Sequence, residues 1–113
     1  MTRVLMNWED MTLVAEGHAG MGDPGKDIVC AGASVLVYAL LNTLLDAERR
    51  GRVELDLQVL KDSGSMRIHA KAKSGEESRI RAYFKVAVMG YKALAEHYPN
   101  NVSIGEVTAH GNL

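Results

Sequence analysis

Residues 27–49 read DIVCAGASVLVYALLNTLLDAER, and this stretch decides the fold. After Asp27 the stretch carries no charged residue until Asp46. Asp27 is a favourable N-cap for a helix, and Arg49 followed by Gly51 supplies the stop signals. The stretch therefore predicts one helix of about six turns.

The length of this apolar helix is close to the lower limit for crossing a bilayer. Its polar residues Ser34, Asn42 and Thr43, and its ends without interfacial aromatic residues, argue against a membrane span. We therefore expect no membrane association. A helix that is apolar all round is typical of the buried centre of a small globular fold, and an oligomer interface can cover part of it.

Alternating segments flank the predicted helix on both sides. Thr2–Trp8 and Met11–His18 alternate polar and apolar residues around a short turn. Val53–Val59 and Ser65–Lys73 repeat the pattern after the helix, again around a turn. The sequence therefore predicts one β-hairpin before the helix and a second one after it.

A second helix is indicated between Glu76 and Tyr98, where apolar residues recur at the spacing of one helical face. These residues are Ile80, Phe84, Ala87, Tyr91, Leu94 and Tyr98. Residues 102–107 predict a last short strand, and residues 109–113 a tail. The order ββαββα(β) indicates one α+β domain over residues 1–113, with two helices packed on a mostly antiparallel sheet.

Charge is balanced along the chain, with 13 basic and 14 acidic residues among 113 and a net charge of -1. Such a chain has no basic field to attract a phosphate backbone, so direct nucleic-acid binding is not expected. Met1–Asn7 lacks the charged and apolar regions of a signal peptide. The single cysteine, Cys30, cannot form an internal disulfide, which fits a reducing cytoplasm.

Neither a metal site nor a cofactor site is predicted. The histidines and the cysteine show no pair at the spacing of a zinc site. We expect His69 and His97 on solvated faces and His110 in the tail. The segment from Gly20 to Gly25 lacks the lysine and hydroxyl spacing of a phosphate-binding loop, so no nucleotide is expected.

His18 and Cys30 are the residues best suited to carry chemistry, and they frame a loop over residues 19–26. The glycines of this loop are Gly20, Gly22 and Gly25. If Asp27 caps the helix, Cys30 falls near its third position, where free backbone amides and the helix dipole stabilise a thiolate. Histidine is the usual base for activating cysteine, so the pair predicts nucleophilic catalysis once the loop brings them together.

Neighbouring groups can support this pair. Asp27 either caps the helix or orients the His18 imidazole, and the sequence does not separate these roles. Ser34 lies one turn after Cys30 on the same face, where its hydroxyl can bond the sulfur or a substrate carbonyl. The backbone amides of Val29 and Cys30 are candidates for an oxyanion hole.

Each of these residues also has a structural interpretation. A lone cysteine in an apolar helix is usually a small buried hydrophobe, and a histidine at a strand end is usually structural or exposed. Ser34 alone would bond back to a helix carbonyl, and the glycines alone would form a turn. The pattern of Cys30 alone favours a structural role, and its conjunction with His18 strengthens the case for catalysis.

The sequence around these residues resembles the signature of the ribosomal-processing cysteine protease family, Prp. The matching residues are Gly17-His18-Ala19, Gly25, Asp27-Ile28-Val29-Cys30-Ala31 and Ser34. The two hairpins, the long apolar helix and a second helix ending in EHYP at residues 96–99 follow the same plan. The resemblance therefore covers most of the chain.

This resemblance implies a homodimeric, cytoplasmic cysteine endopeptidase. The expected substrate is the N-terminal peptide of a ribosomal protein precursor, the extension of bacterial large-subunit protein L-twenty-seven. By position, Cys30 matches the family's nucleophile and His18 its general base, with Asp27 and Ser34 as supporting polar residues. The family's loop orders over its substrate, so the three loop glycines would gate substrate access.

Two other functions stay open on the sequence alone. A prophage-type relative would process capsid or scaffold proteins. A non-catalytic peptide-binding or assembly module would keep the fold and hold a peptide beside the loop. An ordinary, unactivated thiol at Cys30 would favour that non-catalytic module.

Overall fold

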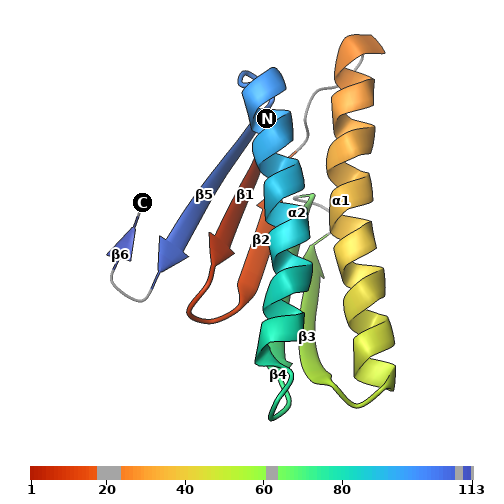
Figure 1. Cartoon of the computed structure of the whole chain (residues 1–113). Coiled ribbons are helices and arrows are strands. Elements are labelled where there is room, and N and C mark those ends of the chain that lie inside the picture. Colours follow the sequence, from red (N-terminus) through yellow and green to blue (C-terminus); the bar gives the residue numbers. More distant parts are fainter. Residues whose placement is uncertain (18–23, 61–63, 109–110, 113) are drawn as a thin grey trace.

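In a computed structural model, the chain forms a layer of two helices lying side by side on one face of a sheet (Figure 1). The structure describes residues 1–17, 24–60, 64–108 and 111–112. The elements are β1 (Thr2–Asn7), β2 (Thr12–Glu16), α1 (Pro24–Arg49), β3 (Val53–Leu60), β4 (Ser65–Ala72), α2 (Glu77–His97), β5 (Val102–Thr108) and β6 (Gly111–Asn112). This order confirms the predicted α+β class and both predicted hairpins.

The sheet has the strand order β3-β4-β2-β1-β5-β6. Only β1 and β5 pair in parallel among the described strands, so the sheet is mostly antiparallel as predicted. The predicted tail was wrong in part, because Gly111–Asn112 forms the short strand β6 against β5. A strand this short has no alternation that a sequence pattern could show.

The start of α1 also differs from the prediction. The helix begins at Pro24, so Asp27 lies inside it and is not its N-cap. Proline suits the first position of a helix for two reasons. Its φ is already helical, and a backbone N–H at this position would have no partner within the helix, so the missing N–H costs nothing. Gly25 and Lys26 therefore belong to α1 and not to the loop, which corrects the assignment of Gly25 to a gating loop.

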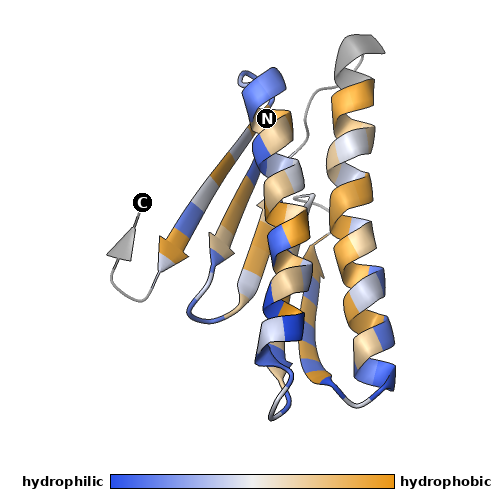
Figure 2. Ribbon diagram, in the orientation of Figure 1, coloured by the Kyte–Doolittle hydropathy of each residue, from blue (hydrophilic) through white to orange (hydrophobic). Residues whose placement is uncertain are grey.

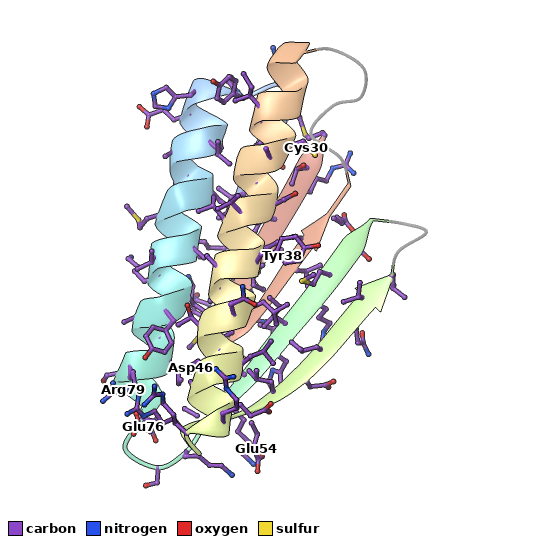
Figure 3. The ribbon with its side chains drawn as sticks, turned by 90° about the vertical axis from the view of Figure 1, so that its right-hand side faces the viewer. Cys30, Tyr38, Asp46, Glu54, Glu76 and Arg79 are labelled. Atoms are coloured by element: carbon purple, nitrogen blue, oxygen red, sulfur yellow. The ribbon has the colours of Figure 1, made fainter. Side chains whose placement is uncertain are left out.

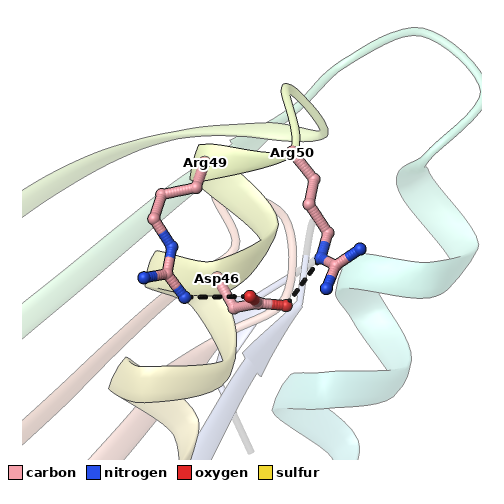
Figure 4. A network of polar contacts seen from close by, with 3 residues as sticks. All are labelled: Asp46, Arg49 and Arg50. Atoms are coloured by element: carbon pink, nitrogen blue, oxygen red, sulfur yellow. Dashed lines mark hydrogen bonds and ion pairs between the residues drawn. The ribbon is translucent and has the colours of Figure 1, made fainter.

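The C-terminal end of α1 carries a small ion-pair network (Figure 4). Asp46 accepts hydrogen bonds from Arg49 Nη2 and Arg50 Nε, both at 2.9 Å. The Arg50 guanidinium, with Arg49 beside it, lowers the pKa of Asp46 below its ordinary value of 3.8. All three side chains reach solvent, so the network orders the helix end and adds little to stability.

The core lies between the sheet and the two helices. Its largest fully buried side chains are Tyr91, Phe84, Met6, Leu13, Leu44, Ile68 and Ile80. The two helices approach closely at Gly90, where an added Cβ would lie 3.0 Å from Leu36 Cδ1 and nearer still to Leu36 Cδ2. A glycine at this point lets the Leu36 side chain rest directly on the backbone of α2.

Among its described side chains, α1 buries one face within the fold, so the predicted buried centre holds for that face, and the other face is left for the oligomer interface that the prediction allowed. Val29, Leu40 and Leu44 face the core, whereas Val35 and Tyr38 are exposed. Figure 2 shows that α1 is apolar over most of its length, with polar residues at its C-terminal end. By length and composition, residues 28–49 form a helix apolar enough to cross a membrane, and 28% of its apolar 18-residue window is buried within the fold.

A polar cluster ties α2 to the β1–β5 side of the sheet. Glu106 accepts a hydrogen bond from Trp8 Nε1 at 2.8 Å and pairs with Lys92 Nζ at 2.9 Å. The Arg81 guanidinium lies 4.6 Å from the centre of the Trp8 ring, a cation–π distance. Lys92, followed by Trp8, lowers the pKa of Glu106 below its ordinary value of 4.5.

Replacing Glu106 with glutamine is expected to lower the free energy of unfolding at pH 7 by about 1 kcal/mol. Because the pKa of Glu106 is lower in the folded state, its contribution is present above the ordinary value of 4.5 and is lost as pH falls through the folded-state value. Urea unfolding at pH 7 and at pH 3 measures the difference. Glu54→Gln is the control, since the Glu54–Lys73 pair is more exposed to solvent and should show a smaller change. A loss equal at both pH values would contradict this account.

Candidate active site

The cavity beside Cys30 has a volume of about 300 Å³ and lies between α1 and the sheet. Cys30, Ala33, Ser34, Val37 and Tyr38 line it from α1. Thr2, Ala15, Glu16 and Gly17 line it from the first hairpin, and Val59, Leu60, Gly64, Ser65 and Met66 from the β3–β4 hairpin. Tyr91 of α2 completes the lining, which is largely apolar. Such a cavity suits an apolar, extended ligand better than a charged small molecule.

Cys30 is a free, half-buried thiol at the edge of this cavity. Ser34 follows one turn later on α1 and lines the same cavity, so the predicted shared face of Cys30 and Ser34 is confirmed. The described contacts include no hydrogen bond between the two side chains. Figure 3 shows Cys30 and Tyr38 on the side of α1 that is turned toward the strands.

The start of α1 at Pro24 changes the expected surroundings of the thiol. Cys30 lies in the second turn of the helix, not near its third residue. The free amides of a helix belong to its first four residues, so the amides of Val29 and Cys30 face carbonyl groups of the preceding turn. The predicted oxyanion hole from these two amides is therefore wrong, as is the stabilisation of a Cys30 thiolate by free first-turn amides.

Several of the predicted site residues lie outside the described part of the chain. These are His18, Gly20 and Gly22, together with the side chain of Asp27. Gly17, the residue directly before His18, does line the cavity that holds Cys30. The residue directly before the predicted base, His18, therefore lies at the cavity that holds Cys30.

Tyr91 fixes the wall of the cavity next to the thiol. Its phenol is buried and donates a hydrogen bond to the carbonyl of Ala33 at 2.8 Å. Burial raises the pKa of the Tyr91 phenol well above its ordinary value of 10.0, so it stays a neutral donor at physiological pH. Ala33 lies between Cys30 and Ser34 on α1, so this hydrogen bond ties the helical turn that carries Cys30 and Ser34 to α2.

The histidines in the described residues lie away from the cavity lining. His97 is exposed, as predicted, and its Nδ1 lies 2.8 Å from the Ala93 carbonyl oxygen. His69 is half-buried, and its Nδ1 lies 2.8 Å from Thr12 Oγ1, which corrects the prediction of a solvated His69. His110 lies outside the described residues. Within the described ranges, no group of three or more His, Cys, Asp or Glu side chains is placed to hold a metal ion.

Sequence reasoning missed three kinds of cavity residue. Tyr38 lies two turns after Cys30 on the same helix, so helical spacing alone could have identified it. Tyr91 was predicted as a core position, but its hydroxyl partner depends on how α2 packs on α1. Val59 and Met66 reach the cavity because β4 pairs with β2, a long-range pairing that no local pattern indicates.

The fold and the site together define a class of protein. A free thiol at the edge of an apolar cavity, on a helix that packs over a mostly antiparallel sheet, is an arrangement suited to a cysteine peptidase. Residues 1–103 match the family described as Cysteine protease Prp. The chain therefore belongs to the Prp family, and the protein is a cysteine protease.

Curated relatives agree with this family. The ribosomal processing cysteine protease Prp of Staphylococcus aureus (strain Mu50) is 26% identical over 94 residues, covering 81% of this chain and 82% of that protein. The protein of the same name from Mycoplasma genitalium is 27% identical over 103 residues, covering 91% of this chain and 95% of that protein. Both matches extend over most of each chain.

Solved structures share the fold. The crystal structure of an essential ribosomal processing protease Prp from S. aureus, with a covalently linked product peptide, superposes with a TM-score of 0.76 at 22% identity. That match covers 94% of this chain and 99% of the other. SMU.848 from Streptococcus mutans superposes with a TM-score of 0.75 at 26% identity, covering 96% of this chain and 98% of the other.

Proposed function

We propose that this protease removes the N-terminal extension of bacterial large-subunit ribosomal protein L-twenty-seven with a Cys30–His18 dyad. The observation that carries the proposal is the position of the free Cys30 thiol at an apolar cavity that Gly17 also lines. His18 follows Gly17 directly in the sequence. The S. aureus relatives are named ribosomal processing proteases, and one was solved with a substrate peptide.

In the proposed reaction, His18 removes the Cys30 proton and the sulfur attacks the carbonyl carbon of the scissile peptide bond. The carbon–nitrogen bond breaks, and the protonated His18 returns a proton to the leaving amine. Water then hydrolyses the thioester, releasing the new C-terminus and the free thiol. Asp27 orients the imidazole and Ser34 binds near the reacting carbonyl in this proposal.

The cavity supports an extended, partly apolar peptide as substrate. Its walls are formed mainly by aliphatic and aromatic side chains, among them Val37, Val59 and Met66. Glu16 is the one carboxylate among the described lining residues and lies at the exposed end of β2. Apolar side chains of a bound peptide would displace water from these walls, which supplies binding free energy.

The test is to incubate the protein with the extended ribosomal precursor and to map the products by mass spectrometry. A single cut that separates the extension from the mature protein supports the proposal. Alkylation of Cys30 should stop the cut, because the alkylated sulfur can no longer form the thiolate that attacks the substrate carbonyl. A phage capsid or scaffold precursor serves as the comparison substrate, and a preference for it would contradict the ribosomal assignment.

We further propose that the protease works in the cytoplasm as a homodimer, through the outer face of α1 and α2. Two apolar hollows of about 170 and 310 Å³ meet there at Leu36. No Asp, Glu, Lys or Arg lies among the described residues that line them, and Val86, which lines the smaller hollow, is 73% exposed. A charge-free, apolar face of this kind can meet its own copy without burying an unpaired charge.

Replacing Val86 with lysine is expected to weaken self-association by at least about tenfold, because the dimer would bury two ammonium groups without partners. Sedimentation equilibrium of the full chain measures the effect. Ser78→Lys is the control, since Ser78 is exposed at the start of α2 and lies outside both hollows. A monomeric parent protein, or equal behaviour of the two variants, would rule out this interface.

A further inference from the structure

The outer margin of the sheet is β3, which pairs only with β4 among the described strands. The Lys73 amide donates to the Arg52 carbonyl at 2.9 Å, so the backbone of Arg52 faces β4. Backbone groups alternate in direction along an antiparallel strand, and the even-numbered residues of β3 therefore face β4 as well. The N–H and C=O groups of Leu55, Leu57 and Val59 consequently point outward.

A second contact gives the same orientation. The Leu55 amide donates to the Glu48 carboxylate of α1 at 2.9 Å, on the side away from β4. The end of α1 thus covers the margin of the sheet at Leu55. Beyond this point, the outward backbone groups of Leu57 and Val59 have no partner among the described contacts. An open edge of this kind is the template on which an extended peptide adds as a further strand.

The side chains at this open edge are apolar and exposed. Leu57 and Val59 are 37% and 53% exposed, although they lie opposite Ile68 and Met66 of β4 on the face that carries the helices. Val59 also lines the cavity that holds Cys30. The edge and the cavity therefore form one continuous surface.

The helix side of this surface comes from Tyr38. Tyr38 is 55% exposed and lines the cavity together with Val59. Figure 3 shows the β3–β4 hairpin beside α1, with the C-terminal end of the helix close to the start of the hairpin. A peptide running along β3 would therefore pass Tyr38 on its way to the thiol.

We propose that the substrate of the Cys30 site binds as an added β-strand along the Leu57–Val59 edge of β3. Its recognised class is an extended peptide with apolar residues at alternate positions, whose backbone bonds to the outward groups of β3. This inference rests on the proposed function, because it assigns how the substrate of the Cys30 site is held. An added strand would also account for the exposed apolar side chains and the outward backbone groups of Leu57 and Val59 next to the cavity.

The first test uses a synthetic peptide that spans the ribosomal cleavage site, with single N-methyl groups placed at successive residues on one side of the bond. N-methylation removes one donor at a time, so an added strand predicts a rise in KM at every second residue and little change between them. A uniform effect along the peptide would overturn the added strand. Failure of the unmodified peptide to be cut would overturn the proposed ribosomal substrate, and this assignment with it.

The second test changes the enzyme. Val59→Lys places a flexible charge on the proposed edge and is expected to raise KM about tenfold while kcat stays within about twofold, because the chemistry is untouched. Gln58→Lys is the matched control, since Gln58 is exposed and lies on the opposite face of the same strand. Equal KM values for the two variants would overturn the proposal.

Discussion

Cys30→Ser is expected to lower kcat for cleavage of the ribosomal precursor by at least about a thousandfold, because a serine hydroxyl is a far weaker nucleophile than a cysteine thiol beside the same base. The substitution is nearly isosteric at a half-buried position, so the free energy of unfolding should stay close to that of the parent. Single-turnover cleavage followed by mass spectrometry measures the loss.

His18→Ala tests the second member of the dyad in the same assay. Residues that act as one unit are not additive, so the Cys30→Ser/His18→Ala double variant should be no slower than either single variant. Ala31→Ser is the matched control, because Ala31 is the exposed neighbour of Cys30 and does not line the cavity. Cleavage by Cys30→Ser at the parent rate would show that another group is the nucleophile. A parent protein that binds the peptide without cutting it would contradict the assignment of the ribosomal precursor as the substrate.

The elements of the fold could be predicted because each one has a clear period. The long apolar run, the helical spacing from Ile80 to Tyr91 and the two alternating hairpins are local signals, and the structure confirms all of them. The order of the strands has no such signal, because β5 lies next to β1 and β4 next to β2 through pairings between distant segments. Pairings between distant strands depend on how the helices pack on the sheet. The sequence of a single segment does not encode that packing.

The site was predictable to the same extent. Helical spacing placed Ser34 on the face of Cys30, and the structure puts both at one cavity. The helix start was misplaced because Pro24 and Gly25 are typical of loops, although proline is equally at home in the first turn of a helix. That small error changed the chemistry inferred for the Cys30 amide. The place of Met66 in the cavity wall could not be predicted from the sequence, because it depends on the pairing of Met66 in β4 with Ala15 in β2.

Gly17→Ala is expected to lower the free energy of unfolding by about 3 kcal/mol, because two costs add at this position. The residue has a φ of 85°, which is strained for alanine, and a Cβ there would run into the carbonyl oxygen of Met1. That carbonyl belongs to a backbone held in place, since the next residue, Thr2, donates to Asn101 at 2.8 Å and begins the pairing of β1 with β5. Neither side of the clash is a flexible side-chain end, so relief requires β1 or the end of β2 to shift.

Gly51→Ala separates the two costs. Gly51 has a φ of 74°, and nothing lies within 4 Å of an added Cβ, so this variant carries the backbone strain alone and should lose about 1 kcal/mol. Urea unfolding of both variants measures the difference.

Gly17 also lines the cavity directly before His18. Gly17→Ala should therefore lower kcat/KM more than about tenfold at a temperature where the variant stays folded, because a catalytic group misplaced by about an ångström reacts far more slowly. Gly51→Ala should cleave like the parent. If Gly17→Ala and Gly51→Ala lose the same stability and the same activity, the close approach of Gly17 to Met1 does not position β2 or His18.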